Sequence, residues 1–169
     1  KKKPLWIRSA RVSRTREGQT KAGYFTESNY ENAVLQLLNE ELGYNYIYGP
    51  DVERDYHSPL YEDVLLPSLQ RINKSLPMDA LTEAIYKLKN FETGTLLQKN
   101  MVFMDYLQNG VPVKYYDKGE ERSTLVYLVD FKNPASNECT VANQWTFIEN
   151  CEKRPDVILF VNGHPLVSV

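Results

Sequence analysis

The chain has 169 residues, of which 42% are hydrophobic and 25% are charged. This size and composition fit one compact domain with enough apolar side chains to bury a core, and they exclude a disordered tail for most of the chain. The apolar run Val157–Val161 is far shorter than the roughly 20 residues that a membrane span needs. We therefore expect a cytoplasmic protein with no membrane contact, in which Cys139 and Cys151 stay reduced.

The charge is unevenly distributed. Residues 1–23 carry a net charge of +7 and the remaining residues carry −9. A basic N-terminal arm on an acidic body could lie along a phosphate backbone and make binding dependent on salt. We favour the alternative, in which the arm pairs with its own acidic body or has no role in recognition. We expect this arm, residues 1–23, to precede a single domain over residues 24–169.

The first half of the chain reads as helical. Ser28 and Glu31 have the spacing of a capping box, and the apolar residues that follow recur at helical intervals until Gly43. A short strand is expected at Tyr46–Tyr48. Three further helices are expected near residues 60–73, 78–89 and 93–108.

The second half is rich in β-branched and aromatic residues, which indicates strands. The expected strands are Val111–Tyr116, Thr124–Phe131, Thr140–Ile148, Val157–Val161 and Leu166–Val169. In the third of these, Val141, Trp145 and Phe147 should share one face. Helices first and strands afterwards predict a mixed α/β (α+β) fold, in which helices flank a mixed sheet.

Asp156 is the residue most suggestive of chemistry, because it stands at the entrance of an apolar strand that should be buried on both faces. Magnesium prefers oxygen ligands and usually takes one or two carboxylates together with water and phosphate. One carboxylate is not a site, and Asp156 could equally be a turn residue after Pro155 or a partner of Arg154. Zinc is not expected, because the cysteines and histidines have no close ligand spacing.

A second arrangement offers the same chemistry. Asp117, a strand, and then Asp130 and Lys132 also give an aspartate followed by an acidic residue and a lysine. Asp130 and Lys132 would share one strand face. Asp117, however, lies in an Asp-Lys-Gly turn, where an aspartate commonly bonds the backbone. We therefore favour Asp156.

Several blocks of the sequence, taken together, resemble a known family. They are Thr26–Glu31 at the head of a helix that ends near Gly43, Leu128–Pro134, Asn143–Trp145, and Arg154–Val167, of which the last is the most specific. In this order they resemble the N-terminal endonuclease region of the restriction (R, or HsdR) subunit of type I restriction-modification enzymes. The resemblance covers roughly residues 24–169 and is loose between about 50 and 110. In that family an apolar residue usually follows Asn-Gly, where this chain has His164.

The resemblance implies a restriction-endonuclease-like, PD-(D/E)xK core that cleaves DNA with Mg²⁺. Asp156 takes the place of the metal-binding aspartate, and an assisting helix glutamate falls on Glu31, for which a capping box would also account. The Glu-x-Lys element is expected immediately beyond Val169. We therefore interpret the sequence as a truncated or incompletely ordered nuclease domain that is inactive by itself.

The resemblance also implies the setting of the whole protein. It would be a type I site-specific deoxyribonuclease that acts on double-stranded DNA, with ATP-driven translocation by downstream motor domains and with methyltransferase and specificity subunits as partners. The sequence itself has no Gly-x-x-x-x-Gly-Lys-Ser/Thr phosphate loop. The alternative function is a non-catalytic nucleic-acid-binding or subunit-docking module with a nuclease-like fold. His57, without an evident partner, and His164, expected in a surface turn, are weaker candidates.

Overall fold

We analysed a computed structural model of the chain, in which residues 26–91, 94–148 and 151–168 are described. The basic arm predicted over residues 1–23 lies outside these residues. The helices are α1 (Glu27–Gln36), which continues as a π-helical turn at Leu37–Glu41, α2 (Glu62–Ile72), α3 (Met78–Lys89) and α4 (Leu96–Asn109). The strands are β1 (Asn45–Tyr48), β2 (Val111–Asp117), β3 (Glu120–Val126), β4 (Cys139–Asn143), β5 (Phe147–Ile148), β6 (Glu152–Lys153), β7 (Val157–Val161) and β8 (His164–Ser168).

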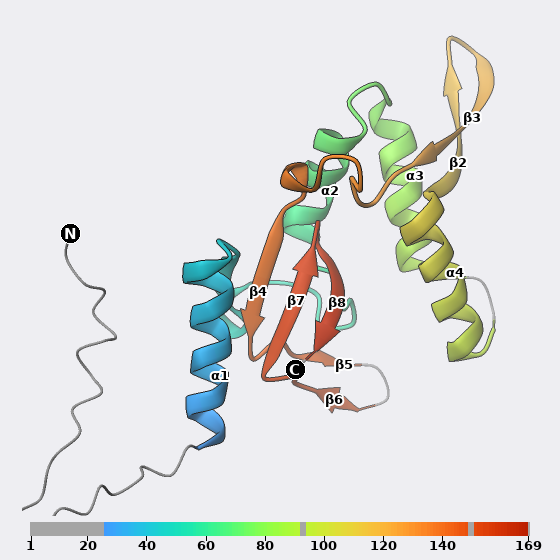
Figure 1. The fold of residues 1–169 in the computed structure, drawn as a ribbon. Helices are drawn as coiled ribbons and strands as arrows, with labels where there is room; N and C mark the ends of the chain where they lie inside the picture. Colours follow the sequence, from blue (N-terminus) through green and yellow to red (C-terminus); the bar gives the residue numbers. More distant parts are fainter. Residues whose placement is uncertain (1–25, 92–93, 149–150, 169) are drawn as a thin grey trace, which may run out of the picture.

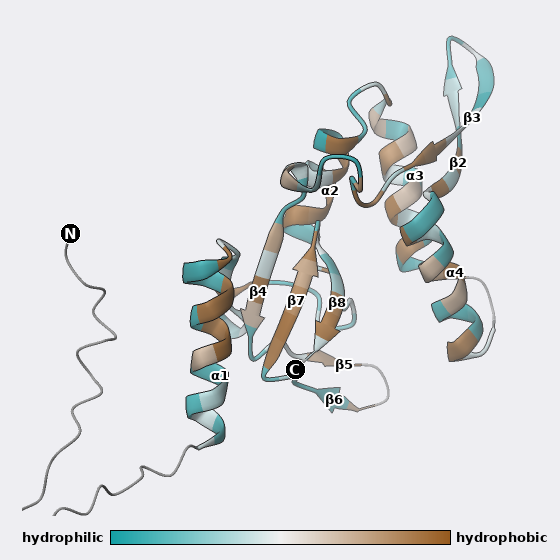
Figure 2. Cartoon of the chain, in the orientation of Figure 1, coloured by the Kyte–Doolittle hydropathy of each residue, from teal (hydrophilic) through white to brown (hydrophobic). Residues whose placement is uncertain are grey.

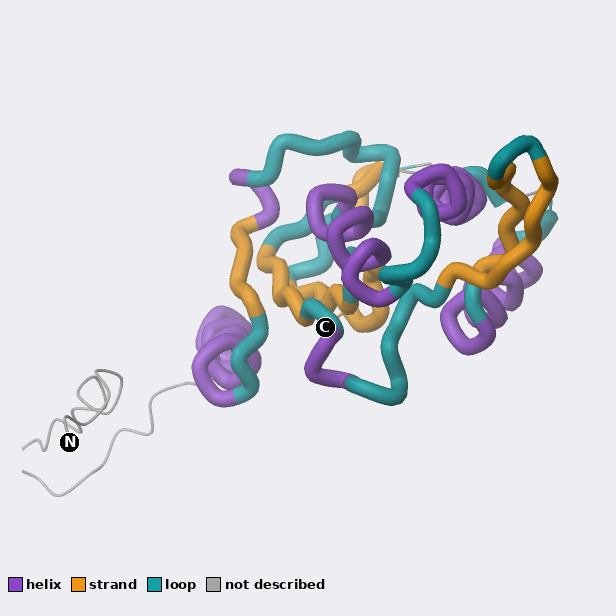
Figure 3. Tube along the Cα trace, turned by 90° about the horizontal axis from the view of Figure 1, so that it is seen from above, coloured by secondary structure: helices purple, strands orange, loops and turns teal. Residues whose placement is uncertain are grey.

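Four strands form the central sheet in the order β1-β4-β7-β8. β1 runs parallel to β4, whereas β7 is antiparallel to both β4 and β8. Figure 1 shows α1 alone to the left of this sheet. In the same view α2 lies near the top of the sheet, and α3 and α4 lie to its right. Viewed from above, α1 lies beside the β1 end of the sheet (Figure 3). The predicted mixed α/β architecture, with helices flanking a mixed sheet, is therefore confirmed.

The two faces of β7 enter different cores, because successive side chains of a strand point to opposite faces. On one face, Val157 joins Val141 of β4 and the α1 side chains Leu35 and Leu38. On the other face, Ile158 and Phe160 pack with Ala142 and Trp145. Figure 2 shows the apolar surface of α1 turned towards the sheet. Burial on both faces explains the uninterrupted apolar sequence of β7.

A third, larger core joins α2, α3 and the β2–β3 hairpin. Its buried residues include Leu65 and Leu69 from α2, Ala84 from α3, and Val111 and Val126 from the hairpin. α4 packs against this core through partly buried side chains and, within its described span, has no fully buried residue.

Several predicted boundaries were wrong, and three elements matter most. The strand expected over Thr140–Ile148 ends at Asn143, because Gln144 adopts a left-handed backbone (φ 58°) and β5 then pairs with β6 as a separate hairpin. As a result Val141 faces α1, whereas Trp145 and Phe147 enter the opposite core. The strand expected over Thr124–Phe131 instead spans Glu120–Val126. The helix expected from residue 93 begins at Leu96, where Thr95 forms the capping box with Gln98.

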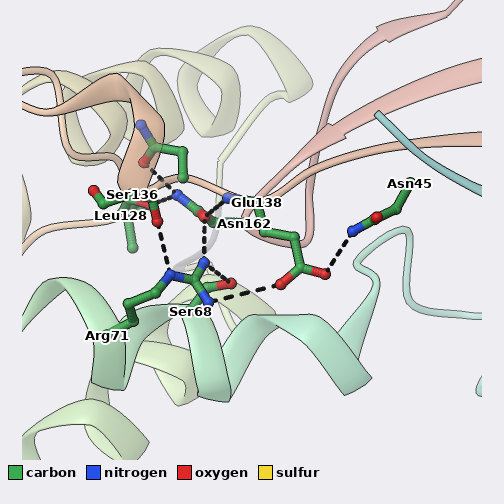
Figure 4. Close-up of polar contacts among 8 residues, drawn as sticks. Asn45, Ser68, Arg71, Leu128, Ser136, Glu138 and Asn162 are labelled. Carbon is green, nitrogen blue, oxygen red and sulfur yellow. Dashed lines mark hydrogen bonds and ion pairs between the residues drawn. The ribbon is translucent and has the colours of Figure 1, made fainter. Parts of the chain in front are cut away.

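Asn162 is fully buried in the turn between β7 and β8 and ties distant parts of the chain together (Figure 4). Its side-chain amide donates to the Leu128 carbonyl (2.9 Å) and to Asn137 Oδ1 (2.8 Å). Its side-chain oxygen accepts from the Glu138 backbone N–H (2.8 Å) and from Arg71 Nη2 of α2 (3.3 Å). Asparagine also tolerates the left-handed φ of 52° that this turn requires.

His164 was expected in a surface turn, and this prediction was wrong. The side chain is fully buried at the start of β8 and packs near the Phe103 ring of α4, with 6.1 Å between ring centroids. Neither ring nitrogen has a hydrogen-bond partner among the described residues. Burial lowers the pKa of His164 to about 4.

Within the described residues, no helix is both long and apolar enough to cross a bilayer. Cys139 and Cys151 are both free thiols.

Replacing Asn162 with glycine keeps a backbone that tolerates the left-handed turn but removes four hydrogen bonds from a buried site. We expect Asn162→Gly to lower the free energy of unfolding by about 3 kcal/mol, because several buried polar groups lose their partners. Equilibrium urea unfolding measures this. The matched control is Lys118→Gly, at an exposed position with the same φ of 52°. Equal effects of the two substitutions would contradict a role for the hydrogen bonds.

His164 should make folding sensitive to acid. Its pKa in the folded chain, about 4, lies below the ordinary value of 6.5, so the unfolded chain binds the proton more tightly between these two values. Stability is then fully present above pH 6.5 and is lost as the pH falls towards 4. When the pH is lowered from 7 to 5, we expect the free energy of unfolding of the wild type to fall by roughly 2 kcal/mol more than that of His164→Leu. Urea unfolding at both pH values tests this, and a constant difference would refute it.

Candidate metal centre

Asp156 lies at a bend immediately before β7, half-buried, at the end of the ladder in which Asn143 of β4 pairs with Val157. This confirms its predicted place at the entrance of a buried strand. The sequence also allowed Asp156 to be an ion-pair partner of Arg154. No such ion pair is present among the described residues.

Two glutamates of α1 meet this aspartate. Glu27 and Glu31 are four residues apart, so they share one face of the helix. One carboxylate oxygen from each of Glu27, Glu31 and Asp156 lies within 4.8 Å of the other two. The structure thus brings together the two residues selected from the sequence and adds Glu27, which was missed. The sequence did contain a signal for Glu27, because this residue lies one helical turn before Glu31 and therefore on the same face of the helix.

The helix cap differs from the prediction in a way that matters for Glu31. Helix α1 begins at Glu27 and its N-cap is Thr26, whose hydroxyl accepts the Asn29 backbone N–H (3.3 Å). The capping box expected between Ser28 and Glu31 does not form. Ser28 is already inside the helix, so the cap no longer accounts for a glutamate at position 31.

Gln144, the residue that follows β4, forms two hydrogen bonds with Asp156. Its backbone N–H donates to the Asp156 carbonyl (3.0 Å), and its side-chain Nε2 donates to Asp156 Oδ1 (3.2 Å). Sequence reasoning did not select Gln144 as a site residue, because a glutamine offers no catalytic or turn signal of its own. The available signal was its place in the Asn143–Trp145 block, one of those that carry the family resemblance.

The donor set suits a hard divalent cation. All three side chains supply carboxylate oxygen, and no nitrogen or sulfur ligand accompanies them in the cluster. Two opposite ligands of Mg²⁺ stand about 4.2 Å apart, since each metal–oxygen distance is about 2.1 Å. The spacing within 4.8 Å therefore needs only a small side-chain adjustment to accept the ion. Asp156, Glu31 and Glu27 are the residues that would hold it.

The rival arrangement at Asp130 does not form. Asp130 lies in an irregular segment after β3, where its carboxylate accepts the backbone N–H groups of Lys132 and Asn133 and the Ser136 hydroxyl. These hydrogen bonds, led by the one from Asn133, hold the pKa of Asp130 below its ordinary value. Asp117 lies at the far end of the β2–β3 hairpin. Asp130 is thus a turn-stabilising residue, as local hydrogen bonding of aspartate permits.

The two histidines lie outside the carboxylate cluster. His57 has a partner after all, since its Nδ1 is 3.2 Å from the Ile148 carbonyl. His164 is buried at the opposite end of β7, paired with Val161.

Comparison with known proteins gives the same family as the sequence motifs. A family model described as the type I restriction enzyme R protein N terminus matches residues 24–169. The chain is 30% identical over 151 residues to the type I restriction enzyme HindI endonuclease subunit of Haemophilus influenzae, with 83% of the chain aligned. It is 31% identical over 146 residues, 80% of the chain, to a Methanocaldococcus jannaschii protein assigned as the type I restriction enzyme MjaIXP endonuclease subunit. The aligned part spans 14% of the length of each relative. The chain therefore belongs to the family of type I restriction enzyme R protein N-terminal domains.

Proposed function

We propose that this domain is the DNA-cleaving part of a type I restriction subunit and hydrolyses phosphodiester bonds with Mg²⁺. The observation that carries this proposal is the convergence of Glu27, Glu31 and Asp156 from a helix and a strand that are far apart in sequence. A purely structural cluster would gain nothing from three like charges at this distance, because they repel one another. A cation removes that repulsion.

Each residue has a defined part in the chemistry. Asp156 and the half-buried Glu31 would bind the ion, and the exposed Glu27 would complete or adjust its coordination. When bound, the ion lowers the pKa of a coordinated water and stabilises the charge that develops on the phosphodiester. The carboxylates fix its position at the end of β7, beside the Gln144 turn.

The register of β7 and β8 indicates where the rest of the site belongs. Ile158 of β7 pairs with Ser168 of β8. If β8 continued in this register, the second residue after Ser168 would lie opposite Asp156. This is the place expected for the Glu-x-Lys element, which would supply another carboxylate ligand and a lysine near the attacked phosphate. Sequencing a few codons further tests this expectation directly.

The relatives suggest the setting of the proposed activity. Both are named as type I restriction endonuclease subunits and are about seven times longer than the matched segment. In such a protein, ATP-driven motor domains would translocate double-stranded DNA and bring it to this domain. Methyltransferase and specificity subunits would select the DNA.

The first test replaces Asp156 with alanine in the full-length subunit, assembled with its partner subunits. Loss of a metal ligand should reduce cleavage of circular DNA at least about 100-fold while ATP hydrolysis continues, because the motor does not use this carboxylate. Agarose-gel cleavage and phosphate release measure the two activities on the same sample.

Asp130→Ala is the matched control, because it removes the competing aspartate without touching the carboxylate cluster. It should retain cleavage and lower the unfolding temperature, since a turn loses its hydrogen bonds. Cleavage that survives Asp156→Ala would favour the docking module instead. Cleavage that is lost only in Asp130→Ala would favour the rival arrangement.

The two glutamates should contribute unequally. Glu31→Gln is expected to raise the Mg²⁺ concentration for half-maximal cleavage about tenfold, because a neutral amide is a weaker ligand than a carboxylate. Glu27→Gln should raise it less, about threefold, because this side chain is exposed. Glu40→Gln, in the π-helical turn at the other end of the same helix, is the control and should leave the requirement unchanged. A titration of cleavage against Mg²⁺ measures all three, and equal values for Glu31→Gln and Glu40→Gln would contradict the assignment.

A further inference from the structure

We infer that Gln144 is a positioning residue that orients the Asp156 carboxylate for the divalent cation. This inference rests on the proposed function, since it assigns a role within the same metal site. Gln144 holds Asp156 at two points: the backbone N–H at the carbonyl (3.0 Å) and the side-chain amide at Oδ1 (3.2 Å).

The backbone of Gln144 has an unusual conformation that serves this contact. Its φ of 58° lies in the left-handed region, which non-glycine residues adopt at an energetic cost. The turn separates Asn143, the last residue of β4, from Trp145, which is fully buried. Without the turn, β4 would continue as the regular strand that the sequence predicted.

Trp145 anchors the turn on its C-terminal side. Its ring packs edge-on against Phe160 of β7, with 4.8 Å between centroids, and against Tyr61 at 5.5 Å. The Arg54 guanidinium lies over the ring, with its central carbon 3.7 Å from the ring centroid. A side chain this large and this enclosed leaves the preceding residue little freedom.

Gly49 confines the turn from the β1 side. A Cβ atom at this position would stand 2.6 Å from the Gln144 carbonyl oxygen, so only glycine permits the observed approach. The Gln144 peptide is thus enclosed by Gly49 and Trp145 and is bonded to Asp156. Three independent contacts fix one strained residue, which is the arrangement expected of a functional position.

The alternation of β7 shows why Asp156 needs such support. Val157 faces α1, so regular alternation would turn Asp156 to the face of Ile158 and away from the glutamates. The chain instead bends at Asp156, and its carboxylate reaches the α1 cluster. Gln144 bonds both the backbone and the side chain at this bend. Its neutral amide occupies Oδ1, and no hydrogen bond among the described residues occupies Oδ2, which stays available to a cation.

The test measures Mn²⁺ binding to the full chain by electron paramagnetic resonance, without DNA or ATP. Gln144→Asn keeps an amide and a residue that tolerates the left-handed backbone, but its side chain is one methylene too short to reach Oδ1. Gln144→Gly keeps the backbone hydrogen bond and relieves the strain at φ 58°. Each variant should bind Mn²⁺ about tenfold more weakly than the wild type, as loss of an outer-shell partner commonly does. Their unfolding temperatures should stay near that of the wild type.

The controls separate this inference from the proposed function. Gln108→Asn makes the same substitution at an exposed position of α4 and should bind Mn²⁺ as the wild type does. Asp156→Ala should lose the site. If Asp156→Ala weakens binding while both Gln144 variants bind normally, the positioning role is wrong and the metal site stands. If Asp156→Ala also binds normally, the metal site and the positioning role both fail. Binding is compared at a temperature at which circular dichroism shows every variant folded.

Discussion

The burial of β7 on both of its faces is the constraint on which the rest of the structure depends. One set of its side chains packs under α1 and the alternate set packs around Trp145, so the strand must lie in the middle of the sheet, between β4 and β8. A strand enclosed in this way has no place for a charge along its length. The first position at which a carboxylate can reach solvent, a cation and a substrate is its entrance, where Asp156 stands. The core thus fixes the location of the candidate metal centre.

The opposite end of β7 is fixed by polar rather than apolar contacts. Asn162 satisfies backbone groups of the segment from Leu128 to Glu138 and accepts from Arg71, which itself bonds the Ser136 carbonyl (2.7 Å) and lies 3.7 Å from Glu138 (Figure 4). This network joins the sheet to α2 and so to the larger core. Buried polar groups with several partners specify one arrangement of the chain, because each alternative leaves some of them unpaired. β7 is therefore held in register from both ends.

The sequence predicted those features that depend on local pattern, and it missed those that depend on contacts across the fold. Helical periodicity and the apolar run of β7 gave the helices, the strand and the place of Asp156. Family motifs pointed to Glu31. Thr26 and Ser28 are both good N-cap residues, so the choice between them depended on the hydrogen bond that Asn29 makes. Nothing local marks Gln144 as a left-handed residue, because the close approach of Gly49 and the burial of Trp145 impose that turn. His164 follows a turn and precedes a proline, which suggested the surface, whereas the packing of α4 encloses it.

Dividing the carboxylates between a strand and a helix makes the site depend on how firmly α1 is held. The core beneath α1 is the small cluster around Leu35, Leu38, Val141 and Val157, and the two leucines keep a little exposure while the two valines are fully enclosed. Three carboxylates at the edge of this contact repel one another by roughly 1 kcal/mol for each close pair, because water screens these partly exposed groups. Summed over the pairs, this repulsion acts to push the N-terminal end of α1 away from β7. Its size is comparable to the hydrophobic stabilisation from burying one leucine side chain. A divalent cation bound at the proposed site would reverse its sign. Cation binding and the docking of α1 would then be thermodynamically linked, so an ion at this site would also tighten the helix that carries two of its proposed ligands.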